Sequence, residues 1–234
     1  MPKHSIRYQG RRFPGEIISH AVWFYHRFSL SFRDVEDLLA ERGIFVTYES
    51  IRQGCRKFGP EYARKLRRRS GRGGDIWLLD EVFVKINGRL QYLWRAVDQD
   101  GEVIDILVQK RRNKKAATRF FRKLLRGEEA TPIKIVTDKL GSYAAARADV
   151  MPSVPHCTKR YANNRAEVSH QRTRQRERQM RRFKSPGQAQ RFLAVHSRVV
   201  NLFVFERHHL AAENYRLLRG EAFATWREIT AQPA

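Results

Sequence analysis

Residues 76–108, IWLLDEVFVKINGRLQYLWRAVDQDGEVIDILV, contain three apolar runs separated by two short turns. The runs are rich in β-branched and aromatic residues and have the length of strands, which places the strands at 76–85, 90–97 and 103–108. Asn87-Gly88 favours a type I′ hairpin turn, and a second turn is expected at 98–101. The stretch therefore predicts three consecutive antiparallel strands.

Helical and strand patterns alternate after this meander. The expected elements are an amphipathic helix, a short buried strand, a helix, a short strand and a long basic helix, at 116–125, 133–137, 142–147, 156–158 and from 163 toward 182. A meander followed by βα units predicts an α/β fold, a mixed sheet with helices packed on it. The ribonuclease-H-like fold has this order of elements.

The region before the meander, 15–58, has the periodicity of helices. Ser31 with Asp34 forms a capping-box pattern, Thr47 is a second expected cap, and Gly59-Pro60 is an expected helix end. Two helices joined by a short turn indicate a helix-turn-helix DNA reader, with an ordinary helical hairpin as the alternative. The polar side of the second helix would present Arg52, Gln53, Arg56 and Lys57 to base edges.

The domain organisation follows from these patterns. A helix-turn-helix domain is expected at 1–63, a basic glycine-ended linker at 64–74, a ribonuclease-H-like domain at 75–182 and C-terminal helices at 183–234.

Basic residues are concentrated in three blocks of this 234-residue chain. The net charge is +23, and residues 64–72, 110–126 and 159–184 together hold 25 Lys/Arg against two acids, which accounts for the whole excess. Such a distribution indicates a polyanionic partner, with three separate solvated faces as the alternative. Ribosomal and nucleoid proteins share this charge, so it favours nucleic acid without selecting a chemistry.

Two cysteines, Cys55 and Cys157, lie far apart and predict neither a disulfide framework nor a zinc ribbon. The apolar runs are too short to span a bilayer, and no signal peptide is visible. A cytoplasmic protein without a membrane partner is therefore expected.

Two aspartates lie within or next to expected buried strands, where an ionised carboxylate is costly unless it is paired or bound to a metal. Asp80 interrupts the apolar run 77–83, and Asp138 ends the expected strand 133–137. A salt-bridged aspartate and a helix N-cap are the structural alternatives. Strand alternation sends Glu81 to the face opposite Asp80, so only one of the two is expected in a given site. Glu167 begins a helix stripe that continues with His170 or Gln171, Arg174 and Arg178.

Three such carboxylates suit phosphodiester chemistry. Two divalent cations about 3.5–4 Å apart activate the attacking oxygen and stabilise the leaving oxygen of an in-line displacement. Mg²⁺ or Mn²⁺ with oxygen ligands fits this set, and the sequence has no zinc-type cluster. Gly71-Arg72-Gly73-Gly74 matches no nucleotide-binding loop, so no nucleotide cofactor is expected.

The sequence resembles the DDE transposases of bacterial insertion sequences, specifically the insertion-sequence-six family. The resemblance is carried by WLLDE, VKING, YLWRAVD, TDK, NNRAE and RERQMRRFKSPGQAQ, at residues 77–81, 84–88, 92–98, 137–139, 163–167 and 176–190. The departures are a short gap of 28 residues between the second and third carboxylates and unexpected residues at Ala162, Val168 and Arg172.

The resemblance implies a ribonuclease-H-like core with catalytic, metal-binding Asp80, Asp138 and Glu167. A DNA contact is implied for Arg174, seven residues after Glu167, and we also expect Lys139 and Arg178 to contact DNA. A bacterial, nucleoid-associated protein is implied as well. The partners would be double-stranded DNA, as terminal inverted repeats and as target DNA, and further copies of the chain. The implied activity is metal-dependent cleavage and strand transfer at the repeat ends. A catalytically inactive helix-turn-helix DNA-binding protein or repressor is the alternative.

Overall fold

The computed structural model describes Tyr8 and residues 12–70, 73–128, 130–159, 161–205 and 210–231. The chain divides into two compact units, one of residues 1–69 with 195–234 and one of residues 70–194. Among the described residues, no helix combines the length and the apolar character needed to cross a membrane.

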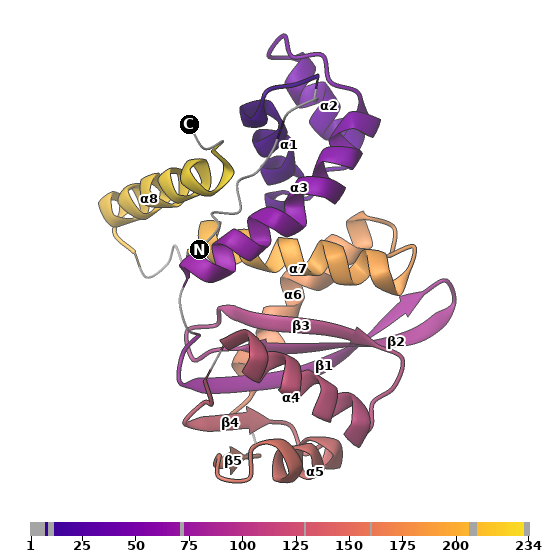
Figure 1. The fold of residues 1–234 in the computed structure, drawn as a ribbon, viewed down its shortest axis with the longest axis vertical. Coiled ribbons are helices and arrows are strands. Elements are labelled where there is room, and N and C mark those ends of the chain that lie inside the picture. Colours follow the sequence, from indigo (N-terminus) through magenta and orange to yellow (C-terminus); the bar gives the residue numbers. More distant parts are fainter. Residues whose placement is uncertain are drawn as a thin grey trace. The chain divides into compact units, whose positions relative to one another are not determined.

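The unit of residues 70–194 is built on a five-stranded sheet with the order β3-β2-β1-β4-β5 (Figure 1). Its strands are β1 (Ile76–Ile86), β2 (Arg89–Val97), β3 (Val103–Gln109), β4 (Lys134–Thr137) and β5 (His156–Cys157). The first three are antiparallel, and β4 and β5 run parallel to β1. Asn87 and Gly88 both have positive φ, 48° and 76°, as the predicted I′ turn requires.

Three helices cover this sheet on two faces. Helices α4 (Lys114–Glu128) and α5 (Gly141–Val150) lie on one face, where Phe120 of α4 and Tyr143 of α5 pack against Trp94 of β2. Helix α6 (Asn164–Gln179) contacts β1 and β2 on the other face and lies behind the sheet in Figure 1. The mixed sheet, its strand order and its two helical layers confirm the predicted ribonuclease-H-like fold.

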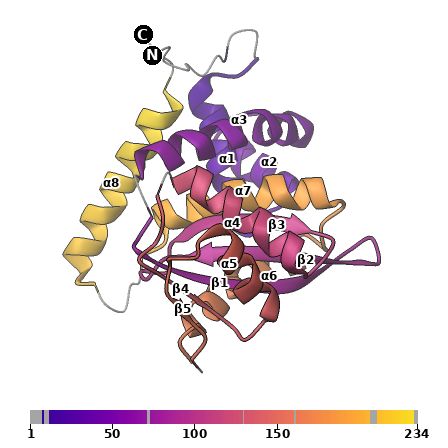
Figure 2. The same ribbon diagram turned by 60° about the horizontal axis from the view of Figure 1, so that its bottom comes forward.

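The other unit consists of helices. Helices α1 (Gly15–Arg27), α2 (Phe32–Ala40) and α3 (Tyr48–Arg69) form a cluster that Figures 1 and 2 both show. Helix α7 (Pro186–Phe203) begins in the sheet unit and ends in this unit, and α8 (Ala212–Thr230) contacts α1 and α3. The capping box of Ser31 and Asp34 is present at the start of α2, as predicted.

Helix α3 corrects two sequence-based expectations. It continues through Gly59-Pro60 to Arg69, so the predicted end at 59–60 and the predicted linker over 64–69 are wrong. The reason is tertiary packing, because Tyr62 and Leu66 extend the buried face begun by Phe58 at intervals of four residues. The boundary between the units falls after Arg69, and residues 71–72 of the predicted linker lie outside the described part.

Candidate active site

The middle of strand β1 and the end of strand β4 bring three carboxylates together. Strand β4 pairs with β1 only as far as Thr137 opposite Leu79, so Asp80 and Glu81 follow directly on β1 while Asp138 follows on the chain leaving β4. One ligand oxygen from each of these three residues lies within 4.8 Å of the other two. The predicted proximity of Asp80 and Asp138 is therefore confirmed.

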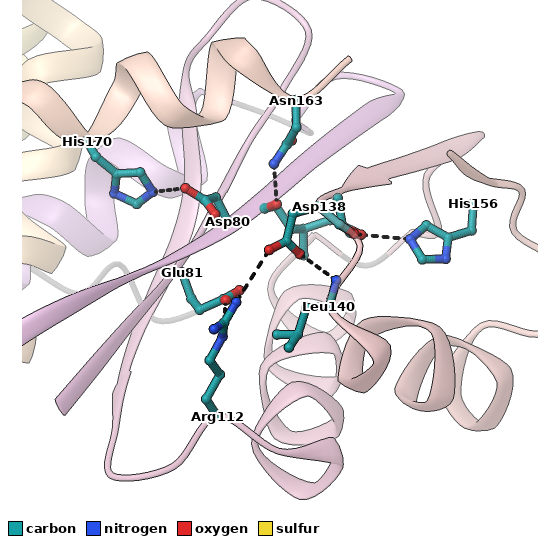
Figure 3. A network of polar contacts seen from close by, with 10 residues as sticks. Asp80, Glu81, Arg112, Asp138, Leu140, His156, Asn163 and His170 are labelled. Atoms are coloured by element: carbon teal, nitrogen blue, oxygen red, sulfur yellow. Dashed lines mark hydrogen bonds and ion pairs between the residues drawn. The ribbon is translucent and has the colours of Figure 1, made fainter. Parts of the chain in front are cut away.

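Glu81 belongs to this cluster, which corrects the expectation that strand alternation would exclude it. Asp80 and Glu81 do leave β1 toward different partners, His170 and Arg112 respectively (Figure 3). However, alternation fixes only the direction of the Cβ atoms. Because β4 ends beside Leu79, the edge of β1 is open at this point, and the carboxylates on the two faces approach each other around it.

Burial determines the protonation of Glu81. Its side chain is 1% exposed, its Oε1 accepts a hydrogen bond from Nε of Arg112 at 2.5 Å, and the buried Tyr143 lies beside it. Loss of solvation raises the pKa of Glu81 to about 7, against the opposing effect of the Tyr143 contact. Glu81 is therefore partly protonated near neutral pH.

The raised pKa predicts a pH-dependent stability that Glu81→Gln should remove. An acid whose pKa is higher in the folded state than in the unfolded state destabilises the fold once it ionises, so its contribution worsens from about pH 4.5 to pH 7 and is constant above. Urea unfolding in the presence of a chelator should show wild type losing stability relative to Glu81→Gln across this window. A constant difference between the two proteins would contradict the assignment.

Asp138 is held by the backbone and by a cation. Its Oδ1 accepts a hydrogen bond from the Leu140 amide at 3.0 Å, and its Oδ2 lies 3.4 Å from Nη2 of Arg112. Arg112 thus bridges Glu81 and Asp138 and offsets part of their mutual repulsion (Figure 3). On the other side of the strand end, the Thr137 hydroxyl lies 2.8 Å from Nε2 of His156.

Asp80 faces helix α6. Its Oδ2 lies 3.1 Å from Nε2 of His170, whose pKa is lowered chiefly by burial. Arg95 stands opposite Asp80 in the β1–β2 register and is 5% exposed; its Nη1 donates to the Thr173 hydroxyl at 2.7 Å. Burial lowers the pKa of Arg95 to about 10. His170 and Thr173 therefore fix the register of α6 on the sheet beside Asp80.

Glu167 is not part of the carboxylate cluster in the described structure, where its side chain is exposed. Its place on α6 is nevertheless close to β1. Asn163, four residues earlier, donates from Nδ2 to the Leu79 carbonyl at 2.8 Å, and His170, three residues later, contacts Asp80. At 3.6 residues per turn, Glu167 is rotated from Asn163 by about 40° around the helix axis. It thus borders the face of α6 that contacts the sheet.

The predicted basic stripe on α6 is largely present. Glu167, His170, Gln171, Arg174 and Arg178 line an open hollow, and His170, which is largely buried, also contacts Asp80. Both alternatives at this step of the stripe, His170 and Gln171, therefore line the hollow. Arg174 also donates to Glu177 at 3.2 Å.

The remaining predicted DNA-binding residues lie at exposed positions of the two units. They are Lys139 after β4, and Arg52, Gln53, Arg56 and Lys57 on α3. Arg52 and Gln53 both donate to Glu49 in the same helix. These five side chains are therefore accessible, and their contacts with DNA stay predictions.

The donor set of the cluster suits a hard divalent cation. All three clustered ligands are carboxylates, and oxygen ligands are those that Mg²⁺ and Mn²⁺ prefer. Sequence reasoning missed Arg112 and Arg95, did not foresee the contact of His170 with Asp80, and did not expect Glu81 and Asp80 in one site. The apolar run around Glu81 was a usable signal, but the contacts of the other three arise from tertiary structure.

Comparison with known proteins identifies relatives. Residues 74–206 match a family model described as a DDE domain. The transposase for insertion sequence-like element IS431mec of Staphylococcus aureus (strain N315) is 31% identical over 165 residues, which cover 68% of this chain and 73% of the relative. The transposase for insertion sequence element IS257 in transposon Tn4003 of Staphylococcus aureus is 30% identical with the same coverage.

Two solved structures are similar at low sequence identity. The HTLV-2 integrase catalytic core domain in complex with magnesium is 14% identical, with a TM-score of 0.43, and the match covers 62% of this chain and 98% of that one. The simian T-cell lymphotropic virus intasome in complex with PP2A regulatory subunit B56 gamma is 15% identical, with a TM-score of 0.41 and coverage of 60% and 56%.

Proposed function

Since this chain belongs to the insertion-sequence-six family of bacterial DDE transposases, we propose that Asp80, Asp138 and Glu167 are the carboxylates with which it cuts and joins DNA. The observation that carries this proposal is the clustering of Asp80, within β1, and Asp138, at the end of the adjacent parallel strand β4, beside the helix that carries Glu167.

Glu167 would join the two aspartates by a rotation of α6 about its axis, which would break the present contacts of His170 and Thr173 with the sheet. Its neighbours on the helix, Asn163 and His170, already contact Leu79 and Asp80, so a rotation of about 40–60° about the helix axis turns Glu167 toward Asp80. The same rotation withdraws His170 from Asp80. A cation between the carboxylates and a DNA phosphate over the basic stripe would both favour the rotated position.

Divalent Mg²⁺ or Mn²⁺, as a pair of ions, would supply Lewis-acid activation of the attacking oxygen and stabilisation of the leaving oxygen. Asp80, Asp138 and Glu167 would orient those ions against the scissile phosphate. Arg174 and Arg178, on the stripe of Glu167, would hold the DNA backbone, and Lys139 would contact it beside Asp138. In strand transfer, a 3′ hydroxyl oxygen bonds to phosphorus while the bond to the leaving 3′ oxygen breaks, so no nucleotide cofactor is consumed.

The helix-turn-helix made by α2 and α3 would read the terminal inverted repeats. Arg52, Gln53, Arg56 and Lys57 lie exposed on α3, and Arg and Gln side chains match guanine and adenine edges. Two ends and a target must be held together for strand transfer, which favours an oligomer on the DNA.

A strand-transfer assay tests the proposal. Duplexes that carry the element's terminal inverted repeats are incubated with a labelled target and with Mg²⁺, Mn²⁺ or a chelator. Joined products with either metal and none with the chelator are expected. Repeat-specific binding without nicking in either metal would favour the alternative function, a DNA-binding protein or repressor without catalysis.

The charge distribution predicts a steep salt dependence of DNA affinity. Each phosphate that a basic side chain neutralises adds about −0.9 to the slope of log K against log salt concentration on duplex DNA. With 25 Lys/Arg in three blocks, we expect at least about six phosphate contacts and a slope of about −5 or steeper. Fluorescence anisotropy from 50 to 300 mM salt measures it, and a slope near zero would exclude these blocks as the DNA-binding surface.

A further inference from the structure

Two consecutive arginines adopt a backbone conformation that L-residues disfavour. Arg181 and Arg182, which follow the end of α6 at Met180, have φ of 50° and 72°. In this left-handed region a Cβ atom crowds the following carbonyl, and glycine is the residue that occupies it without strain. Two adjacent non-glycine residues there form the most strained short segment among the described residues of this unit.

The fold requires this backbone but not these side chains. The Arg181 and Arg182 amides donate to the carbonyls of Arg178 and Glu177, both at 3.0 Å, which closes α6 and directs Phe183 into the core. Both arginine side chains are exposed. Glycine at either position would make the same backbone hydrogen bonds with less strain, so the reason for arginine lies outside the folding of the chain.

The two side chains complete a strongly basic hollow. Arg174, Glu177, Arg178, Arg181 and Arg182 line it, so four guanidinium groups surround one carboxylate. Glu177 is 8% exposed and accepts a hydrogen bond from Arg174. Within the described part of the chain, neither Arg181 nor Arg182 has an acidic partner, which leaves both charges available to an anion.

We propose that Arg181 and Arg182 form a clamp for a backbone phosphate of duplex DNA, at a set distance from the cleaved bond. This inference rests on the function proposed above, because the distance is counted from Glu167. Twelve residues separate Glu167 from Gln179 at the end of α6, which is about 18 Å along the helix at 1.5 Å per residue. The phosphates of each strand are spaced about 3.4 Å along the duplex axis, so with α6 lying along that axis the clamp contacts the backbone about five to six nucleotides from the scissile phosphate.

The test compares variants that separate strain from charge. Arg181→Gly with Arg182→Gly removes both, whereas Arg181→Lys with Arg182→Lys keeps the strained backbone and the charge. All DNA measurements use the full chain with Asp80→Asn, so that the DNA stays intact. The readouts are Tm, affinity for a repeat-end duplex, its salt slope, and the effect of single neutral methylphosphonates along the strand.

The variant with Arg181→Gly and Arg182→Gly, the glycine pair, should have a Tm about 2–4 °C above that of wild type. It should bind DNA about tenfold more weakly, and the magnitude of its salt slope should be smaller by about one to two units. The variant with Arg181→Lys and Arg182→Lys, the lysine pair, should keep the wild-type salt slope of DNA affinity. A methylphosphonate five to six nucleotides from the cleaved bond should weaken binding by wild type and by the lysine pair, but not by the glycine pair.

Unchanged affinity and slope for the glycine pair would overturn the clamp, as would a lower Tm, because the strain argument would then be wrong. An interference position elsewhere on the strand would overturn the assigned distance. These outcomes differ from a failure of the proposed function, which would be seen as strand transfer by Asp80→Asn in a separate assay without any change in DNA affinity.

Discussion

Asp80→Asn is expected to lower strand transfer at least about a thousandfold, which corresponds to a loss of about 4 kcal/mol in transition-state stabilisation. The amide keeps the shape of the side chain and its contact with His170, but it removes the charge that holds a cation. Binding to repeat-end DNA should stay within about twofold of wild type, because the basic blocks and α3 are unchanged. Quantified joining of a labelled end in Mg²⁺ measures the first effect, and anisotropy measures the second.

The matched control is Asp149→Asn. Asp149 is an exposed aspartate in the same unit and pairs with Lys114 at 2.8 Å, outside the carboxylate cluster. Exposed pairs of this kind contribute little to stability, so this variant should retain wild-type joining. Strand transfer by Asp80→Asn within about tenfold of wild type would remove Asp80 from the catalytic set.

Much of the fold is predictable because local signals and packing agree over the sheet. Asn87-Gly88 specifies a turn that requires positive φ. The strands before and after this turn, β1 and β2, carry the buried Trp77 and Trp94. Helix α3 shows where local signals fail. Pro60 forfeits one helical hydrogen bond, but Tyr62 packs edge-on against Trp226, and no local pattern reveals a contact across 164 positions.

The candidate site was predictable to the extent that it depends on carboxylates within or next to buried strands. Asp80 lies within β1 and Asp138 directly follows β4, and the pairing of these two strands as far as Leu79 and Thr137 brings both carboxylates together. Glu81 was excluded by alternation, which says where its Cβ points but not where a flexible side chain ends at an open strand edge. The contact of His170 with Asp80 could not be predicted, because it depends on the rotation of α6 about its axis, to which the hydrogen bond from Arg95 to Thr173 contributes.

Glu167→Gln is expected to lower strand transfer at least about a thousandfold, whereas Glu81→Gln should cost about tenfold. The two glutamates differ in what their oxygens already contact. Glu81 is buried and engaged by Arg112, and an amide at this position keeps an oxygen acceptor for that guanidinium. Glu167 is exposed and borders the face of α6 that contacts β1, so its carboxylate is the one free to complete a cation site.

The comparison of these two variants decides the ligand set. Both should unfold cooperatively at a Tm close to that of wild type or higher, since the Glu167 side chain is exposed and the amide at 81 removes a buried ionisable group. Calorimetric titration of Mn²⁺ into the DNA complex should show weaker binding for Glu167→Gln than for Glu81→Gln. If Glu81→Gln instead abolishes joining and Glu167→Gln retains it, the cation is held by Asp80, Glu81 and Asp138 as they stand, and α6 then serves only to bind DNA.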